Sequence, residues 1–292
     1  MFINGVKIID TFAEGFRFYG TRFIITAENL TWAFEAGRKA TGFATSIIAC
    51  GCEADLEGEV LDTPDGRPGV SVLLFASTAQ ELERQVVNRI GQCVMTCPTT
   101  ACFNGLPEKD TITVGGKLRY FGDGWQSSKL FGQIRYWRIP VMDGEFLVEE
   151  KFGYTGEAST GNFLILGEDK EGTLKAAQEA VKAIRKIPGV ILPFPGGMTR
   201  SGSKVGSVYS FLKASTNTAY CPSLKGSLDT LLAPDVNCVL EIVVCGLNEK
   251  AVRKALKVGI FAACLPKIKA ITAGNYGGKL GDFNVYLHQL LS

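Results

Sequence analysis

A single acidic side chain interrupts an otherwise apolar stretch of the chain. Residues 237–248 read N-C-V-L-E-I-V-V-C-G-L-N, and Glu241 is the one charged residue among them. A short run rich in Val and closed by a glycine is typical of a strand buried on both faces. Burial raises the pKa of a carboxyl group, because the ionised form loses its solvation. A protonated Glu241 would donate a hydrogen bond, and such a donor stabilises the oxyanion of acyl transfer.

A second interpretation of this stretch stays open. Strand carboxylates are most often solvated or paired with a cation. Residues 237–248 would then form an edge strand whose Glu241 faces water or a lysine.

Two glycine-rich stretches are candidates for close backbone approach to a ligand. Residues 196–204 read G-G-M-T-R-S-G-S-K, and the lysine does not follow the second glycine directly, which argues against a P-loop. The N–H groups of this stretch remain candidates for holding some other anion. Residues 274–281 read G-N-Y-G-G-K-L-G and lack the following helix of a dinucleotide fingerprint. Its glycines would let the backbone approach a ligand or another subunit closely. Ordinary turn formation would account for them equally well.

The cysteines and the histidine form no recognisable catalytic or metal-binding set. His288 is the one histidine in the chain, which argues against Ser-His-Asp and Cys-His catalysis and limits zinc sites to thiolates and carboxylates. Three of the nine cysteines, Cys93, Cys97 and Cys102, are spaced unlike the ligands of an iron–sulfur cluster. Buried small side chains explain them better, and we expect no metal.

Composition narrows the class of protein further. The net charge is +2, and Lys and Arg do not gather in runs, so we expect no nucleic-acid partner. No segment reaches the roughly 18 apolar residues of a membrane span, and the start lacks the features of a secretory signal. We therefore expect a cytoplasmic protein with reduced thiols.

Strand-helix-strand units repeat along the chain, two in each half. In the first half we expect strands at 22–26, 45–49, 70–75 and 93–96. Asn29 is expected to cap a helix to Thr41, and Thr78 with Glu81 has the spacing of a capping box. The expected inward faces of these helices are Trp32, Ala36 and Ala40, and Leu82, Val86 and Ile90.

The second half repeats this pattern. Strands are expected at 163–166, 190–194, 238–245, 268–272 and 283–287, with helices at 173–186 and after Asn248. Their expected inward residues are Leu174, Ala177, Val181 and Ile184, then Val252, Leu256, Ile260 and Ala263. Two such units in one antiparallel sheet, with both helices on one face, form a ferredoxin-like (split βαβ) α/β sandwich. We predict an α+β protein of two such lobes, 1–149 and 150–292, the second carrying Glu241.

Several strings occur together in the order typical of one family. They are T-P-D-G-R within 62–68, I-G-Q-C-V-M-T at 90–96, F-G-D-G at 121–124, P-F-P-G-G at 193–197, S-K-V-G-S at 203–207, A-S-T-N at 214–217, Y-C-P at 220–222 and the glycine loop 274–281. In these, and over essentially its whole length, the sequence resembles the formylmethanofuran–tetrahydromethanopterin formyltransferase family.

The resemblance has consequences for fold, substrates and assembly. It implies two ferredoxin-like lobes per subunit and a homodimer or homotetramer, with the methanofuran cleft at a subunit interface. It implies no metal and no prosthetic group, because methanofuran and tetrahydromethanopterin serve as coenzyme substrates. The key acid of the family lies in the strand before G-L-N, which is Glu241 in this chain. Substrate-lining candidates are Phe121, Asp123, Lys204, Asn217, Tyr220, Asn275 and Lys279.

Two functions of other classes remain open. One is a non-catalytic ligand-binding or scaffolding protein, because a fold alone does not determine function. The other is a thiol-dependent acyltransferase, which would follow a ping-pong rate law.

Overall fold

The computed structural model describes residues 1–292, which group into two lobes. Residues Phe18–Ala158 form what we call the middle lobe. Residues Met1–Arg17 and Ser159–Ser292 together form what we call the Glu241 lobe. The division of the chain into 1–149 and 150–292 stays a prediction.

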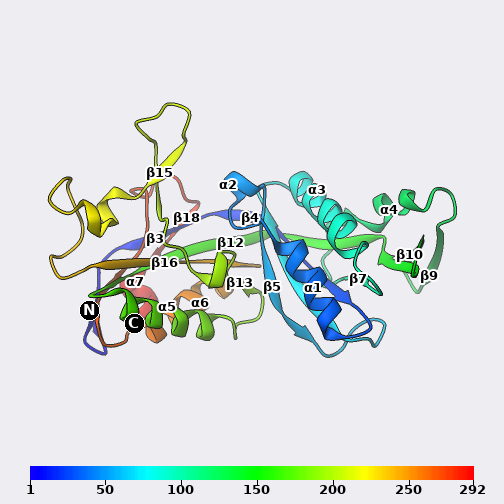
Figure 1. Cartoon of the computed structure of the whole chain (residues 1–292), viewed down its shortest axis with the longest axis horizontal. Helices are drawn as coiled ribbons and strands as arrows, with labels where there is room; N and C mark the ends of the chain where they lie inside the picture. The colour runs from blue at the N-terminus through cyan, green and yellow to red at the C-terminus, as the bar shows by residue number, and fades with distance from the viewer. The chain divides into compact units, whose positions relative to one another are not determined.

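The middle lobe is built on a split βαβ pair (Figure 1). Its elements are β4 (Arg17–Thr26), α1 (Leu30–Thr41), β5 (Glu53–Val60), β6 (Gly69–Ala76), α3 (Ala79–Arg89) and β7 (Ala101–Asn104). The strands lie in the order β5-β6-β4-β7, each antiparallel to its neighbours. Buried side chains of α1 and α3, such as Ala36 and Val86, share one apolar core with Val70 and Val72 of β6. This is the ferredoxin-like arrangement predicted from the sequence.

Further strands extend this sheet. β7 pairs in parallel with β11 (Gly144–Glu149), which continues to β10 (Ile134–Val141) and β9 (Ser127–Phe131). β8 (Thr111–Thr113) pairs with the start of β12. The short helices of this lobe are α2 (Ile47–Cys50), the π-helix η1 (Ile90–Val94), α4 (Gly115–Leu118) and the 3-10 helix η2 (Arg119–Gly122).

Two strands predicted in this lobe are wrong. Residues 93–96 continue α3 through the π-helix η1, because Val94 extends the buried stripe of Leu82, Val86 and Ile90 by one more turn. Residues 45–49 mostly form α2, and the strand follows it as β5, whose acidic residues are tolerated because β5 lies at the edge of the sheet.

The helix faces were predicted correctly except at two positions. Asn29 and Thr78 cap α1 and α3 as expected, through side-chain bonds to the N–H groups of Trp32 and Glu81. Trp32 and Leu174, however, are exposed. Ala33 and Thr173 are buried in their helices instead.

The Glu241 lobe repeats the same topology. Its pair consists of β12 (Lys151–Gly167, in this lobe from Ser159), α5 (Lys170–Ile184), β13 (Val190–Ile191), β16 (Cys238–Gly246), α6 (Glu249–Ala263) and β17 (Ile268–Thr272). The strand order is β17-β12-β16-β13, again antiparallel throughout. Because both lobes share this order, the prediction of two ferredoxin-like lobes is confirmed.

Smaller elements surround this sheet. β2 (Val6–Ile8) adds to β17 in parallel and carries β1 (Phe2–Ile3) at its outer side. β3 (Phe12–Gly15) pairs with β18 (Phe283–Tyr286), and α7 (Leu287–Leu291) ends the chain. The segment between β13 and β16 holds η3 (Pro195–Gly197), the hairpin β14 (Ser203–Val205) and β15 (Ala214–Thr216), then η4 (Thr218–Tyr220) and η5 (Pro222–Leu224).

The two faces of this sheet are covered differently. Phe163, Ile165, Ile242 and Val244 share the core that α5 and α6 form on one face. On the other face, Leu164 and Leu166 pack against residues of the segment between β13 and β16 rather than against a helix. Figure 1 shows α5 and α6 on one side of β16 and the yellow β14–β15 hairpin on the opposite side. Glu241 alternates with Ile242 along β16 and therefore belongs to the helix-free face.

Candidate functional site

Glu241 lies in a strand that is paired along both edges. It faces Leu164 of β12 in the register of the sheet. On its other side Thr199 exchanges two backbone bonds with Glu241, at N···O distances of 2.8 and 2.9 Å. The edge-strand interpretation is therefore wrong for this position.

The carboxyl group of Glu241 has one side-chain partner. Asn162 Nδ2 donates a hydrogen bond of 2.7 Å to its Oε1. Burial raises the pKa of Glu241, and the bond from Asn162, which favours the ionised form, offsets this only in part. Part of the residue's surface remains accessible, so the acid is both desolvated and reachable. These are the properties required of an acid that meets a substrate.

Two further residues come close to this carboxyl group. A Cβ placed on Gly202 would lie 3.2 Å from Oε2 of Glu241, so the absence of a side chain at position 202 leaves that oxygen room. Burial raises the pKa of Tyr276, and the charge of Glu241 raises it further.

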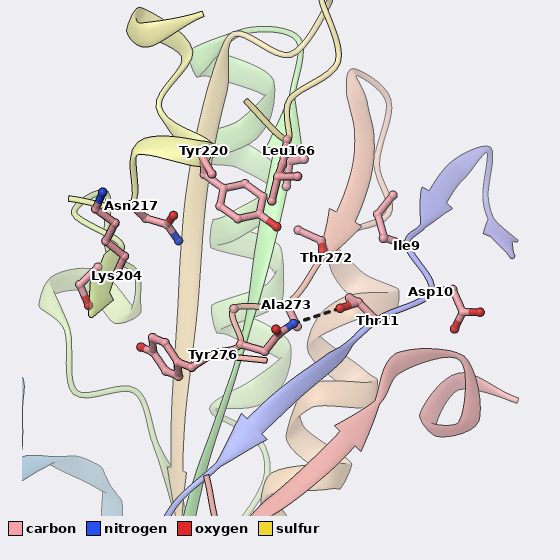
Figure 2. A pocket seen from close by; sticks show the side chains of 15 residues that line it. Ile9, Asp10, Thr11, Leu166, Lys204, Asn217, Tyr220, Thr272, Ala273 and Tyr276 are labelled. Carbon is pink, nitrogen blue, oxygen red and sulfur yellow. Dashed lines mark hydrogen bonds between the residues drawn. The ribbon is translucent and has the colours of Figure 1, made fainter. Parts of the chain in front are cut away.

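A pocket of about 410 Å³ lies on the helix-free face of the Glu241 lobe. Figure 2 shows Lys204, Asn217 and Tyr220 reaching it from the segment between β13 and β16, and Thr272, Ala273 and Tyr276 from the end of β17. The remaining lining residues are Ile9, Asp10, Thr11, Leu166, Ser203, Ala219, Leu231, Gly274 and Asn275. Four of the predicted substrate-lining residues therefore share one pocket: Lys204, Asn217, Tyr220 and Asn275.

Polar contacts fix these lining residues in place. Asn275 Nδ2 donates to Thr11 Oγ1 and to the Phe12 carbonyl, both at 3.1 Å, so its amide nitrogen ties the loop to β3. Lys204 Nζ donates to Thr218 Oγ1 at 3.2 Å and remains exposed. The pocket thus has a supported wall and one cation at its border.

The glycine loop 274–281 holds an anion that belongs to the chain itself. Glu14 of β3 accepts hydrogen bonds from the N–H groups of Tyr276, Gly278 and Gly281. Gly277 and Gly278 have φ of +74° and +73°, a conformation that lets successive N–H groups converge on an anion. Burial acts to raise the pKa of Glu14, but the backbone donors outweigh it and lower that pKa. The loop is therefore built around a carboxylate, which the sequence did not suggest.

The other three predicted residues lie outside this pocket. Phe121 lines a second pocket of about 700 Å³ in the middle lobe, together with Gly91, Gln92, Met95, Thr96, Cys97, Pro98, Pro140, Val141, Met142 and Asp143. Asp123 follows η2 in the middle lobe with φ of +50°. Lys279 is exposed in the glycine loop. Substrate contact by these three residues stays a prediction.

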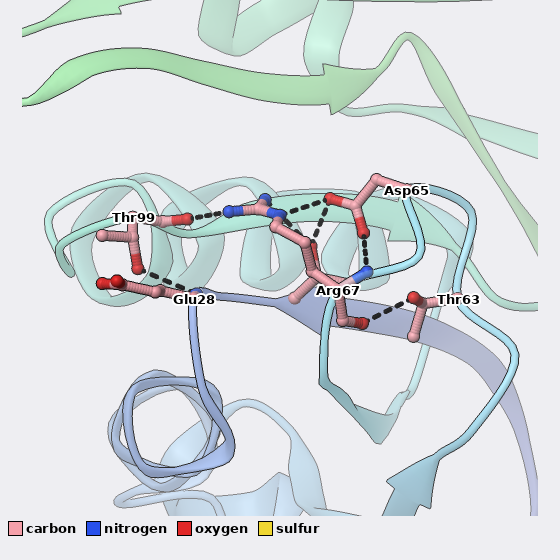
Figure 3. Close-up of polar contacts among 6 residues, drawn as sticks. Glu28, Thr63, Asp65, Arg67 and Thr99 are labelled. Carbon is pink, nitrogen blue, oxygen red and sulfur yellow. Dashed lines mark hydrogen bonds and ion pairs between the residues drawn. The ribbon is translucent and has the colours of Figure 1, made fainter.

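A charged network supports one wall of the second pocket. Arg67 Nη1 donates to the Thr99 carbonyl at 2.5 Å, and its Nε pairs with Asp65 at 2.8 Å (Figure 3). Thr99 also donates its N–H to Asp143, which lines the pocket. Thr99 has φ of +65°, an uncommon conformation for a β-branched residue, which the surrounding bonds hold. The conspicuous T-P-D-G-R string thus has a supporting role beside a pocket.

Asn162, the hydrogen-bond partner of Glu241, was not predicted from the sequence. It follows the polar residues Ser159 and Thr160 and directly precedes the apolar run F-L-I-L, in the strand that pairs with β16. No local pattern marks it, because it meets Glu241 only through the register of the two strands.

Two family models together cover nearly all of the chain. The model for formylmethanofuran-tetrahydromethanopterin formyltransferase matches residues 1–141, and the model for the proximal lobe of the same enzyme matches residues 144–290. The chain belongs to this formyltransferase family.

Individual relatives of the family match the chain over its full length. The formylmethanofuran–tetrahydromethanopterin formyltransferase of Methylobacillus flagellatus is 54% identical and covers 100% of both chains. That of Methanopyrus kandleri is 48% identical, covering 99% of this chain and 100% of the relative.

Solved structures of the family agree with the fold. The Methanosarcina barkeri enzyme superimposes with a TM-score of 0.93 at 47% identity, over 99% of this chain and 100% of that one. A chain of the formyltransferase/hydrolase complex of Methylorubrum extorquens, solved with methylofuran, reaches 0.97 at 47% identity, over 100% and 99%.

No group of three or more His, Cys, Asp or Glu side chains is arranged to hold a metal ion. None of the helices has the length and apolar character needed to cross a membrane.

Proposed function

We propose that this chain catalyses formyl transfer between formylmethanofuran and tetrahydromethanopterin, the activity for which its family relatives are named. The observation that carries the proposal is Glu241, a desolvated acid that remains accessible on the helix-free face of its lobe. Family membership supplies the substrates, and the environment of Glu241 supplies a chemical role.

The proposed reaction is direct attack in a ternary complex. A ring nitrogen of tetrahydromethanopterin attacks the formyl carbon, forming a C–N bond and a tetrahedral carbon that bears an oxyanion. Glu241, kept protonated by burial, donates a hydrogen bond to that oxyanion. The intermediate then collapses, the bond to the methanofuran nitrogen breaks, and the proton of the attacking nitrogen ends on the leaving amine. No bond to the enzyme forms.

Positioning is the second contribution of the protein. Holding both coenzymes in a near-attack geometry lowers the barrier by roughly 7–11 kcal/mol. The pocket of about 410 Å³ offers apolar and amide groups, and Lys204 is the candidate partner for an anionic group of a coenzyme. We propose Asn217, Tyr220 and Asn275 as further contacts there.

Assembly and location belong to the same proposal. We propose a homodimer or homotetramer, supported by apolar side chains that the β14–β15 hairpin exposes to solvent, among them Val208 and Phe211. All nine cysteines are free, in keeping with a reducing cytoplasm. Light scattering on the purified protein measures the subunit number, and a monomer would contradict the proposed assembly.

A spectrophotometric assay with both authentic coenzymes tests the function. We expect formyl transfer with a sequential rate law and unchanged activity after alkylation of accessible cysteines. A ping-pong rate law with loss of activity on alkylation would identify a thiol-dependent acyltransferase instead. Binding of the coenzymes without transfer would leave the non-catalytic ligand-binding alternative.

A further inference from the structure

We propose that Asn162 is a positioning residue for the proposed formyl transfer, and that it fixes which oxygen of Glu241 carries the proton. By donating to Oε1, Asn162 leaves the proton on Oε2, the oxygen that faces Gly202. This inference rests on the proposed function for its catalytic meaning, although the hydrogen bonding that it describes does not.

The orientation of the Asn162 amide is determined by its neighbours. The N–H of Gly274 donates to Oδ1 of Asn162 at 3.2 Å, and Nδ2 donates to Glu241 at 2.7 Å. An amide turned by 180° would place Nδ2 against the Gly274 donor and Oδ1 against a carboxyl oxygen. The Gly274 N–H and Nδ2 would then be two donors facing each other without an acceptor, so the Gly274 N–H selects the orientation in which Nδ2 donates to Glu241.

This orientation dictates the protonation pattern of the neutral acid. A protonated carboxyl group has one hydroxyl donor and one carbonyl oxygen, and the carbonyl oxygen is the better acceptor. Because Asn162 donates to Oε1, that oxygen takes the carbonyl role and Oε2 becomes the hydroxyl. Gly202, which lies next to Oε2, contributes no side chain that would cover this oxygen. The proton of Glu241 is thereby presented on one defined side.

The sheet places Asn162 where it can do this. Asn162 pairs with Val243 and Leu164 pairs with Glu241, so Asn162 and Glu241 are diagonal neighbours on one face of two antiparallel strands. Through Gly274, which lines the pocket of about 410 Å³, Asn162 also joins the acid to the pocket wall. One side chain thus couples the position of the acid to the position of the loop.

The bond from Asn162 has two opposing effects, which makes the role testable. It orients the acid, which favours catalysis, and it favours the ionised form, which lowers the pKa of Glu241. Tyr276 is the titratable neighbour whose own pKa reflects the charge of Glu241. Removing Asn162 should therefore reduce kcat and yet move the loss of activity at alkaline pH to higher pH.

The kinetic experiment uses Asn162→Ala, Asn162→Gln and a matched control. We expect Asn162→Ala to lower kcat by about tenfold to hundredfold, as the loss of a residue that orients a metal ligand does. The alkaline limb of the pH–rate profile should move to higher pH. Asn162→Gln keeps an amide donor and should recover part of both effects. Asn237→Ala removes an asparagine that bonds the Glu168 carbonyl in the same lobe, and should change neither. A loss of kcat with no upward shift would mean a merely structural role and overturn the proposal.

An infrared experiment tests the bond without formyl transfer. The carbonyl stretch of protonated Glu241 is isolated as the difference between wild type and Glu241→Gln and followed against pH. We expect Asn162→Ala to move this band to higher frequency and its titration to higher pH. An unchanged band would overturn the positioning role even if the enzyme transfers formyl groups. A shifted band in a protein without transferase activity would sustain the bond and refute the proposed function alone.

Discussion

Glu241 and Glu149 are buried glutamates in the two lobes, and burial raises the pKa of both. Glu149, at the end of β11, has a pKa of about 7 and accepts a hydrogen bond from the backbone N–H of Asn104. Like Glu241, it is not among the lining residues of either pocket described above, but it is only 6% exposed. Glu241 retains some accessible surface, position 202 places no side chain against its Oε2, and Asn162 donates a hydrogen bond to its Oε1. A raised pKa therefore reports desolvation, whereas access to a substrate separates a catalytic candidate from a buried acid.

The largest expected effect on activity comes from replacing Glu241, the buried acid that retains accessible surface. Glu241→Ala removes the proposed oxyanion donor, and loss of one such donor typically costs about 2.7–4 kcal/mol in the barrier, or about 10²–10³ in kcat. Glu241→Gln keeps an N–H donor and should retain more activity than Glu241→Ala. Steady-state kinetics of both variants, with circular dichroism to confirm folding, measures the difference.

A matched control and a contrary outcome complete this test. Glu179→Ala alters an exposed glutamate of α5 that pairs loosely with Lys182, and it should leave kcat unchanged. Equal activity in the Gln and Ala variants of Glu241 would show that donation from this side chain plays no part.

The second prediction concerns the pH dependence of stability at Glu149, the acid with almost no accessible surface. The pKa of Glu149 is raised from 4.5 to about 7 in the folded lobe, so the folded state favours the neutral form. Its contribution to the unfolding free energy is fully present below pH 4.5. This contribution is lost as the pH rises to about 7, a change of about 3 kcal/mol. Glu149→Gln cannot ionise, and its unfolding free energy relative to wild type should rise by about that amount between pH 4.5 and pH 8.

Urea unfolding of both proteins at the two pH values measures this, and formyl transfer serves as the control. We expect activity at pH 7 to be unchanged in Glu149→Gln wherever the protein is folded. The contrast between the lobes would fail if Glu149→Gln abolished turnover, because a buried acid would then be acting at a distance from both pockets.

The elements of the two lobes could be predicted because their signals are local. Caps such as Asn29 and Thr78, and apolar stripes such as Leu82-Val86-Ile90, depend on residues three or four apart. The same stripe explains the failure at 93–96, because Val94 continues it and the helix continues with it. β5 was missed because an edge strand tolerates acidic residues that local pattern rules assign to a loop.

The site could be predicted only in part, because its contacts are long-range. Glu241 was identifiable as a charge inside an apolar strand, whereas its partner Asn162 is 79 positions away in the chain and meets it only through strand register. Glu14 is 262 positions from Tyr276, so no reading of the glycine loop could show that the loop encloses a carboxylate of the protein itself. Spacing along the sequence carries no information about such pairs.

Glu14 holds the glycine loop 274–281, whose first residues line the pocket of about 410 Å³, and the third prediction tests this support. Glu14→Gln replaces one carboxylate oxygen by an NH₂ group, so the N–H groups of the glycine loop lose part of their acceptor. We expect a loss of about 2 kcal/mol in unfolding free energy at pH 7, typical of a hydrogen bond to a charged group, and a higher KM for at least one coenzyme. Because the folded-state pKa is lowered, the difference from wild type should shrink as the pH falls below 4.5.

Denaturant titrations at pH 7 and pH 4 check the stability, and initial rates check KM. Asp10→Asn, at an exposed carboxylate on the border of the same pocket, is the matched control for charge. Its contact with His288 is at the surface and worth little, so stability should change little at either pH. A loss of stability in Glu14→Gln that did not depend on pH would mean that packing, rather than the anion, holds the loop.

The smallest effect is expected at Arg67, which supports the pocket of the middle lobe as Glu14 supports the pocket of the Glu241 lobe. Arg67→Lys keeps the charge but cannot bond Asp65, Thr26 and the Thr99 carbonyl together, because an ammonium lacks the planar fork of a guanidinium. We expect a loss of about 1 kcal/mol in unfolding free energy, measured by urea titration, and faster amide exchange at Thr99. Arg38→Lys, on an exposed helical pair with Glu35, should change neither. If Arg67→Lys left exchange at Thr99 unaltered, the positive φ of that residue would be maintained by Asp143 and Glu28 without the arginine, and the parallel between the two pocket walls would not hold.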